Sequence, residues 1–250
     1  MCIRDRTIGI TISLILRAKT EWIWVEELYK GINKALKKYG GMIVGGDCAK
    51  GDEKIISITA FGIQGDLELR RNACKPGDII LTTGIHGLSK LGLMIRNKIN
   101  FDNVPLNKRL IRKSIKHFCR PQVYPNFLKK LLKTRSNKKI KRIGCTDSSD
   151  GLFQAIQDLA TASNCKAIIN YEKIPQDKDW PKGDKWDEYY FFGGEDYELV
   201  FSLPKEWAKN ISKLDKDIYE IGFFVDGKPS IEFKDNKKNK LFNNKPFKHF

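Results

Sequence analysis

The sequence predicts a mixed protein of the α/β or α+β class. Apolar residues recur between residues 22 and 38 with the 3.6-residue period of an amphipathic helix. Short apolar runs, at 42–44, 55–61 and 79–83, are typical of strands. Because helical and strand-like segments are mixed along the whole chain, we expect helices and strands to pack together in the fold.

The elements of the first third follow in order. Residues 1–6 contain no helix start or strand and have the character of a translated sequencing adapter, so they are left out of the predicted fold. The helix over 22–38 is expected to end at Gly40-Gly41. A short buried strand, Met42–Val44, should then run into Gly45-Gly46-Asp47, and a second strand covers Ile55–Phe61.

The remaining elements are bounded by turn residues. Gly77-Asp78 predicts a turn before the strand Ile79–Thr83, which opens into Gly84–Gly87. Ser149 or Asp150 is expected to cap a helix that runs to about Ser163. The other predicted segments are a strand at Ala167–Asn170, a loop at Pro175–Trp186, strands at Tyr197–Leu203 and Ile221–Val225, and an irregular tail at Asp235–His249.

Composition argues against several classes of protein. No run of 18 or more apolar residues is present, so no membrane partner is expected. The net charge of +16 comes from lysines spread along the chain, and the densest run, residues 129–142, has no aromatic residue for base stacking. We therefore interpret that run as a solvated helix end and loop and expect no nucleic-acid partner.

The cysteines predict a reducing environment. All six are scattered and none forms a CxxC pair, so we expect free thiols and a cytoplasmic location. They are Cys2, Cys48, Cys74, Cys119, Cys145 and Cys165. The three histidines are too dispersed for a zinc site.

Three acidic clusters could carry chemistry, and each also has an ordinary structural explanation. Gly45-Gly46-Asp47 could bring a carboxylate to Mg²⁺ near phosphates, or be a tight turn. Asp147–Leu152 places two carboxylates three residues apart at a helix start, which suits a metal–phosphate site or a helix cap with a spare acid. Gly193–Leu199 could present a carboxylate and a ring to a cationic ligand, or be a polar turn entering a strand.

The order of these motifs resembles one family. None of them is a Walker A motif, a kinase glycine-rich loop or a Rossmann fingerprint. Together with Arg71–Asp78 and Gly84–Gly87, however, they are similar in order and spacing to the thiamine-monophosphate kinase family, over about residues 7 to 250. Gly193–Leu199 is the most specific part, because related synthetases of the same fold lack it.

The resemblance implies a two-domain, synthetase-like fold and a homodimer when full length. Residues 7–68 would be the remainder of an N-terminal ATP-binding and dimerisation domain, and residues 69–250 a C-terminal α/β domain. The family's early aspartate-rich motifs would precede residue 7, which implies that about a quarter of such an enzyme is not in this sequence. We therefore expect the chain as written to be inactive.

The resemblance also implies the site residues. Asp47 and Asp150 would be catalytic, with Mg²⁺ held by Asp47, Asp147 and Asp150. ATP, as co-substrate, would contact Tyr29, Gly46, Asp47, Arg71 and Ser149. The thiamine moiety would contact Glu195 and Phe247, since an aromatic face and a carboxylate suit a cationic ring.

The implied reaction is direct, Mg²⁺-assisted transfer of the γ-phosphoryl group of ATP to thiamine monophosphate. Some positions depart from the family pattern. Cys48 and Ala49 replace two usual threonines, Asn72-Ala73 replaces Ser-Gly, and Ser148 replaces an aliphatic residue. Two alternatives stay open: another ATP-using synthetase of the same superfamily, and a basic nucleic-acid-binding module, which would bind with strong salt dependence.

Overall fold

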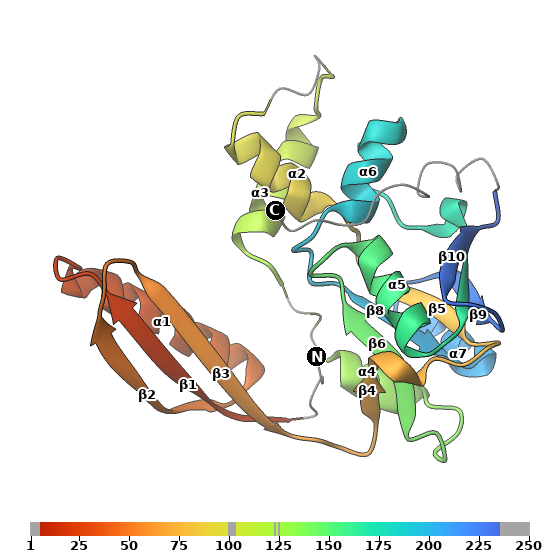
Figure 1. Cartoon of the computed structure of the whole chain (residues 1–250), viewed down its shortest axis with the longest axis horizontal. Coiled ribbons are helices and arrows are strands. Elements are labelled where there is room, and N and C mark those ends of the chain that lie inside the picture. The colour runs from red at the N-terminus through yellow and green to blue at the C-terminus, as the bar shows by residue number, and fades with distance from the viewer. Residues whose placement is uncertain (1–5, 100–103, 123, 125, 236–250) are drawn as a thin grey trace. The chain divides into compact units, whose positions relative to one another are not determined.

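The computed structural model describes residues 6–99, 104–122, 124 and 126–235. The chain divides into two compact units, Cys2–Glu68 and Leu69–Phe250. Each unit combines a sheet with helices (Figure 1). The mixed α and β class predicted from the sequence is confirmed.

The N-terminal unit is a three-stranded sheet with one helix. Its elements are β1 (Arg6–Leu16), α1 (Trp22–Tyr39), β2 (Met42–Lys50) and β3 (Ile55–Ile63). The strand order is β2-β1-β3, with β2 parallel and β3 antiparallel to β1. Strand β1 begins at Arg6, which is one of the six residues left out of the predicted fold, and residues 1–5 lie outside the described part.

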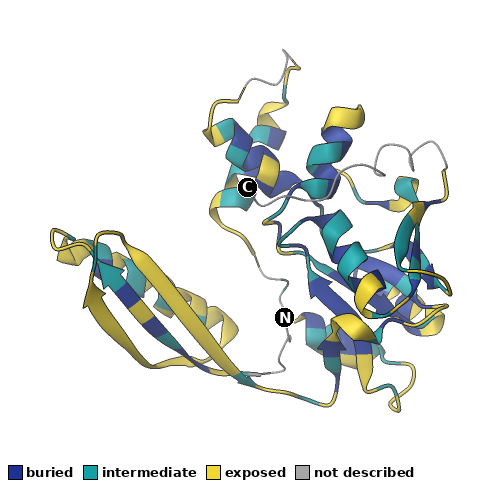
Figure 2. Cartoon of the chain, in the orientation of Figure 1, coloured by how far each residue is buried: buried dark blue, intermediate teal, exposed yellow. Residues whose placement is uncertain are grey.

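The core of this unit lies between β1 and α1. Ile12 and Leu14 are each 1% exposed, and α1 residues including Leu28 and Ile32 pack against them. Successive side chains of a strand leave opposite faces of a sheet. Helix α1 therefore covers one face of the sheet along its middle strand, where Figure 2 shows the buried residues.

The prediction of a short buried strand at Met42–Val44 is wrong in two respects. Strand β2 continues to Lys50, so Gly45-Gly46-Asp47 lies inside it and does not follow it. All nine residues of β2 are exposed. The physical reason is position, because β2 is an edge strand while the burial centres on β1.

The C-terminal unit is built on a seven-stranded sheet in the order β10-β7-β9-β5-β8-β6-β4. Its strands are β4 (Glu68–Arg70), β5 (Ile79–Thr83), β6 (Arg142–Asp147), β7 (Lys166–Ile169), β8 (Leu199–Leu203), β9 (Ile218–Val225) and β10 (Ser230–Phe233). Its helices are α2 (Leu88–Arg96), α3 (Lys108–Cys119), α4 (Phe127–Thr134), α5 (Leu152–Ala162), α6 (Asp184–Phe192) and α7 (Lys205–Leu214), with short 3₁₀ turns at Arg71–Ala73 and Tyr171–Lys173.

Helices cover both faces of this sheet. Ile80 and Val200 belong to the core cluster that includes the apolar side of α5. Phe201, the next residue along β8, leaves the opposite face and meets Phe127 of α4, with 4.8 Å between the ring centroids. Helix α7 also packs on β5, β8 and β9. The central strands are therefore buried on both faces.

Several predicted elements of this unit are confirmed. The strand Ile79–Thr83 and the helix ending near Ser163 are present, and residues 129–142 form the end of α4 and a loop before β6. The predicted cap is wrong: Gly151 is the N-cap of α5, without a side-chain hydrogen bond. The predicted loop at Pro175–Trp186 ends early, because α6 begins at Asp184. The tail beyond residue 235 lies outside the described residues.

The cysteines that the structure describes are free thiols, as the sequence predicts. They are Cys48, Cys74, Cys119, Cys145 and Cys165. Burial raises the pKa of Cys74 to about 12 and that of Cys165 to about 11. These buried thiols therefore stay protonated and unreactive at neutral pH. Among the helices that the structure describes, none has the length and apolar character needed to cross a membrane.

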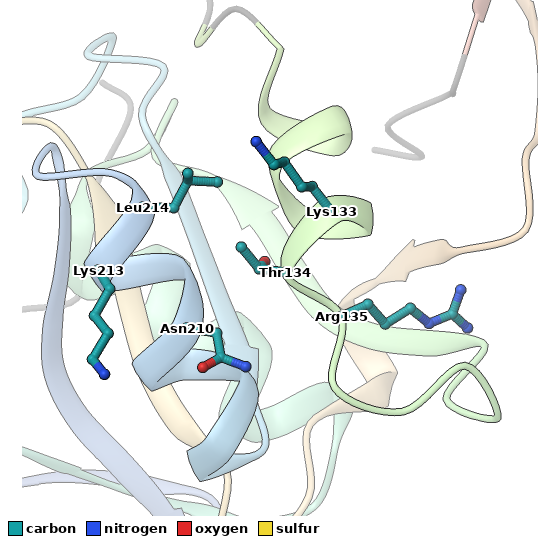
Figure 3. A pocket seen from close by; sticks show the side chains of 6 residues that line it. All are labelled: Lys133, Thr134, Arg135, Asn210, Lys213 and Leu214. Carbon is teal, nitrogen blue, oxygen red and sulfur yellow. The ribbon is translucent and has the colours of Figure 1, made fainter.

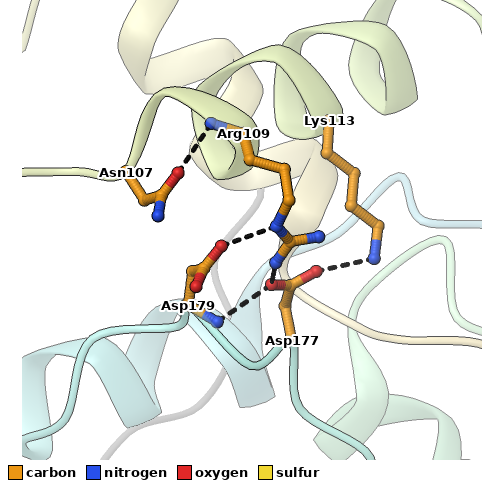
Figure 4. A network of polar contacts seen from close by, with 5 residues as sticks. All are labelled: Asn107, Arg109, Lys113, Asp177 and Asp179. Atoms are coloured by element: carbon orange, nitrogen blue, oxygen red, sulfur yellow. Dashed lines mark hydrogen bonds and ion pairs between the residues drawn. The ribbon is translucent and has the colours of Figure 1, made fainter.

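An ion-pair network ties α3 to the loop before α6 (Figure 4). The buried carboxylate of Asp177 accepts from Lys113 at 2.7 Å and from Arg109, which also donates to Asp179 at 2.6 Å. Burial alone would raise the pKa of Asp177, but the hydrogen bonds from Lys113, the Asp179 amide and Arg109 outweigh it and lower the pKa to about 2.

The Asp177→Asn variant should lose stability in a pH-dependent way. Because the folded pKa of Asp177 lies below its unfolded value of 3.8, its contribution is complete above about pH 4 and is lost as the pH falls toward 2. The loss should be on the order of 1–2 kcal/mol at neutral pH, since both cations are partly exposed and screened. Urea unfolding at pH 7 and pH 3 measures it. An equal loss at both pH values would contradict the assignment.

Candidate active site

Three of the sequence motifs meet at one end of the central strands. Strand β6 ends at Asp147, which pairs with Leu199 at the start of β8. Strand β5 ends at Thr83, and Thr82 pairs with Val200. Because β8 lies between β5 and β6, the loops after β5 and β6 flank the loop before β8. The motif residues 84–87, 147–152 and 193–199 therefore lie together at this edge.

Backbone hydrogen bonds lock the loop after β6 to the loop before β8. The Ser148 amide donates to the Glu198 carbonyl at 2.8 Å, and the Glu198 amide donates to the Ser148 hydroxyl at 3.1 Å. The Glu195 amide donates to the Ser149 carbonyl at 2.8 Å. Ser148, which departs from the family pattern, is fully buried, and its hydroxyl thus has a structural partner.

Glu198 fastens the same loop to β5. The Thr83 hydroxyl donates to its carboxylate at 2.5 Å and accepts from the Leu199 amide at 2.9 Å. Burial raises the pKa of Glu198 to about 7. Gly84 has a φ of +59°, and a Cβ there would lie 2.2 Å from a Glu198 carboxylate oxygen. The loop after β5 thus requires glycine at this point.

The surface of these loops combines carboxylates with one aromatic ring. Glu195 is exposed, and Asp147 and Asp150 are half-buried. Tyr197 is 38% exposed, and its pKa is raised by partial burial and then by the negative charges of Glu195, Asp147 and Asp150. A ring within reach of three carboxylates is suited to a flat cationic ligand.

Arg71 brings a positive charge to the same region. It begins the 3₁₀ turn Arg71–Ala73, which packs on β6 and α5. Its Nε donates to the Thr146 hydroxyl at 3.1 Å, and its guanidinium lies 3.4 Å from the carboxylate of Asp158. The side chain is 45% exposed. The structure therefore anchors Arg71 beside the end of β6, with a partly exposed guanidinium that is able to bind phosphate oxygens.

The acids fit a hard cation by their chemistry, but they do not form a complete cage. Mg²⁺ prefers oxygen ligands and takes one or two carboxylates together with waters and phosphate oxygens. Asp147 and Asp150 supply such oxygens. Within the described ranges, no group of three or more histidine, cysteine or acidic side chains is arranged to hold a metal ion.

The N-terminal unit separates the residues that the resemblance groups around ATP. Tyr29 packs from α1 against the cluster of Ile12 and Leu14. Asp47 stands opposite Ser13 in the pairing of β1 with β2, so its side chain leaves the other face of the sheet. Within this unit, Tyr29 and Asp47 therefore do not converge on one point. Asp47 is exposed and accepts from the Cys48 amide at 2.8 Å.

Gly46 has a packing role that the sequence did not reveal. A Cβ at this position would lie 1.9 Å from the carbonyl oxygen of Ile12 on the neighbouring strand. Real Cβ atoms essentially never approach so closely. The atom in the way belongs to the backbone, which cannot move aside as the end of a flexible side chain can. Strand pairing alone therefore accounts for glycine here, and its contact with ATP stays a prediction.

Gly46→Ala should destabilise the N-terminal unit by about 1–3 kcal/mol, because β1 and β2 must move apart. Gly45→Ala is the matched control, since its Cβ would meet Thr11 at an ordinary 3.9 Å. Guanidinium unfolding curves of the two variants provide the comparison. Equal stability of the two would contradict the packing explanation of Gly46.

A basic pocket lies among residues outside the three acidic motifs (Figure 3). It has a volume of about 510 Å³ between α4 and α7. Lys133, Thr134, Arg135, Asn210, Lys213 and Leu214 line it. Figure 3 shows its cationic side chains pointing in different directions, and the Arg135 guanidinium is engaged by the carbonyl of Lys138 at 2.8 Å. The pocket has no convergent polar groups, so we do not assign the chemistry to it.

Comparison with known proteins identifies the family. The model of the AIR synthase related N-terminal domain matches residues 1–64, and the model of the corresponding C-terminal domain matches residues 75–234. A thiamine-monophosphate kinase of Prochlorococcus marinus is 38% identical over 252 residues, covering 98% of this chain and 74% of that protein. The chain belongs to the thiamine-monophosphate kinase family.

Solved structures agree with this family. The structure described as AaThiL complexed with AMPPCP and TMP superposes with a TM-score of 0.75 at 27% identity, covering 98% of this chain and 74% of that one. The hydrogenase maturation protein HypE of E. coli gives a TM-score of 0.67 at 16% identity, covering 91% of this chain and 70% of its own. HypE shares the fold, while the sequence identity favours the thiamine-monophosphate kinase family.

The structure describes most of the residues that the family resemblance implies for the site, and their roles stay predictions. Asp147, Ser149, Asp150, Arg71 and Glu195 all come to the end of β6 or the loop beside it. Phe247 lies outside the described residues. The ring of Tyr197 is exposed in the same region, although the resemblance implies no role for it. Its signal was the acidic residue on each side of it in a glycine-led turn.

Proposed function

We propose that this protein transfers the γ-phosphoryl group of ATP to the terminal phosphate of thiamine monophosphate. The observation that carries the proposal is the convergence of three distant motifs at the ends of β5, β6 and β8. That edge presents carboxylates and a ring, and Arg71 is anchored to Thr146 near the end of β6. The kinase activity of the family and the complex of AaThiL with AMPPCP and TMP support it.

Each residue of the candidate site is proposed for a role that suits its charge and chemistry. Both reactants are anions, so the site must offset their repulsion before the terminal oxygens can approach. Arg71 would bind phosphate oxygens of ATP, and Ser149 would contact the nucleotide. Glu195 and Tyr197 would hold the cationic thiamine ring through a carboxylate and an aromatic face. Together they would align acceptor and donor for in-line attack, without a protein nucleophile.

Mg²⁺ is part of the proposal because the site offers carboxylate oxygens as ligands. Asp147 and Asp150 would hold it. Asp47 as a further Mg²⁺ ligand is carried over from the family resemblance. Bound there, Mg²⁺ supplies neutralisation of the phosphate charge that develops during transfer. Gly46, Tyr29 and Asp47 as ATP contacts, and Phe247 as a thiamine contact, are carried over from the family resemblance.

A homodimer and a cytoplasmic location are also proposed. The N-terminal sheet exposes apolar side chains of β3 on the face away from α1, where Ile55 is 50%, Phe61 47% and Ile63 46% exposed. Exposed apolar patches of this kind mark interaction surfaces, which supports dimerisation through this unit. The free thiols support a reducing compartment.

The test is ATP-dependent conversion of thiamine monophosphate to thiamine diphosphate. It should be run on the chain as printed and on a version joined to the residues of the Prochlorococcus relative that this chain does not match. Turnover by either version supports the proposal. A version that folds and binds ATP, yet leaves thiamine monophosphate unphosphorylated, would favour another ATP-using synthetase of the superfamily. Strong salt-dependent binding of DNA or RNA would favour the basic binding module.

A further inference from the structure

Asp196 caps a helix that lies far away in the sequence. It is fully buried, and its carboxylate accepts from the Gly87 amide at 2.5 Å and from the Ser89 amide at 2.9 Å. These amides stand at the start of α2, whose N-cap, Gly87, offers no side chain. First-turn amides have no acceptor within their own helix and attract negative charge. Asp196 supplies that acceptor from the loop before β8.

The same contacts hold the backbone of the neighbouring residue. The Ser89 hydroxyl donates to the Glu195 carbonyl at 2.8 Å, while the Glu195 amide donates to Ser149. His117 of α3 completes the cluster, with its Nδ1 3.0 Å from the Ser89 hydroxyl and 3.5 Å from the Asp196 carboxylate. Hydrogen bonds with the start of α2 and with the loop after β6 thus hold residues 195 and 196 in place.

The residues on each side of Asp196 have strained backbones. Glu195 has a φ of +66° and Tyr197 a φ of +54°, in the left-handed region that non-glycine residues rarely adopt. Such conformations persist at functional sites only where the surroundings impose them. As a result, successive side chains alternate in direction. The side chain of Asp196 is buried, while those of Glu195 and Tyr197 are exposed.

We propose that Asp196 is a positioning residue for substrate binding. By capping α2 it holds Glu195 and Tyr197 in the left-handed conformations that present their side chains to thiamine monophosphate. Asp196 itself does not touch the substrate, because it is buried behind the two residues that do. The inference rests on the proposed function for the identity of the substrate, and on the contacts of Asp196 alone for the holding of the loop.

Asp196→Asn tests the proposal, because the two amides bond different carboxylate oxygens and the variant replaces one of these oxygens with an NH₂ group that cannot accept. We expect it to weaken the binding of thiamine monophosphate by about 10-fold in the presence of AMPPCP, measured by calorimetry. The affinity for AMPPCP should stay within about 2-fold. Asp78→Asn is the matched control: it makes the same change at another buried aspartate, which precedes β5 at the opposite end of that strand from Gly84–Gly87, and should leave both affinities unchanged.

A double-mutant cycle separates positioning from general destabilisation. If Asp196 acts through Glu195, adding Asp196→Asn to Glu195→Gln should weaken thiamine monophosphate binding by clearly less than it does in the wild type. Full additivity would overturn the proposal. So would an Asp196→Asn variant that binds thiamine monophosphate as the wild type does.

Hydrogen exchange provides a readout that needs no substrate. Asp196→Asn should speed amide exchange in residues 194–197 and at the start of α2, whereas Asp78→Asn should not. Unchanged exchange in Asp196→Asn would overturn the proposal even if affinity fell. A wild-type chain that binds AMPPCP but not thiamine monophosphate would instead overturn the proposed function, and the exchange pattern distinguishes that result. If Asp196→Asn does not fold, Ser89→Ala removes the hydroxyl contacts with Glu195 and His117 but leaves Asp196 and the Ser89 amide in place, and it should weaken thiamine monophosphate binding in the same selective way.

Discussion

Asp150→Asn should reduce phosphorylation of thiamine monophosphate by about 100-fold or more, in whichever version of the protein turns over. The change removes a negative charge from the loop after β6, where Asp147 and Asp150 would hold Mg²⁺ against the phosphates. Losing one preorganised electrostatic group in an active site typically costs about 10²–10³ in rate. Steady-state assays at saturating ATP measure the effect.

Asp226→Asn is the control for this prediction. Asp226 is exposed in the turn between β9 and β10, so the variant makes the same chemical change away from the site. It should keep turnover within about 2-fold of the wild type, as surface substitutions usually do. An Asp150→Asn enzyme that is equally active would show that the carboxylate plays no part in the reaction.

Trp207→Ala should cost about 3–5 kcal/mol of unfolding free energy. Trp207 is fully buried in α7, and its indole nitrogen donates to the Leu131 carbonyl at 3.1 Å and lies 3.2 Å from the Thr134 hydroxyl. The variant removes the ring and leaves a cavity between α7 and α4. Because domains are stable by only about 5–15 kcal/mol, a large share of the total is lost. Urea unfolding followed by far-ultraviolet circular dichroism gives the value.

Trp207→Phe separates the contribution of packing from that of the indole hydrogen bond. It keeps an aromatic ring in the core but removes the indole donor, so it should cost only about 1–2 kcal/mol. It also keeps the prediction testable if Trp207→Ala fails to fold. Equal losses in the two variants would mean that hydrogen bonding, and not packing, is what Trp207 contributes.

Local sequence patterns predicted the elements with strong local signals. The strand Ile79–Thr83 is an apolar run behind a Gly-Asp turn, and α1 has a regular apolar period. Helix α3 was missed because seven of its twelve residues, KRLIRKSIKHFC, are basic or polar and hide its narrow apolar side. The exposure of β2 could not be predicted, since it depends on which strand occupies the edge of the sheet.

The site was predictable only as a set of motifs. Each acidic cluster had an ordinary explanation by itself, and the resemblance to a family supplied the grouping. The structure adds that β8 lies between β5 and β6, an order that no local pattern contains. Asp196 shows the limit most clearly. In the sequence it is one acidic residue of a polar turn. In the structure its partners are the amides of Ser89 and Gly87, which lie 107 and 109 residues earlier.

The strand order has a consequence for how the protein is made. Strand β5 is synthesised early, but both of its neighbours, β8 and β9, come from the last quarter of the chain. The Leu199 amide that binds Thr83 is 116 residues downstream. During translation β5 is therefore an unpaired apolar strand while more than a hundred residues emerge, a state that invites aggregation. Pairing over such separations also slows folding, so the edge that carries the three motifs can form only after β8 has been synthesised.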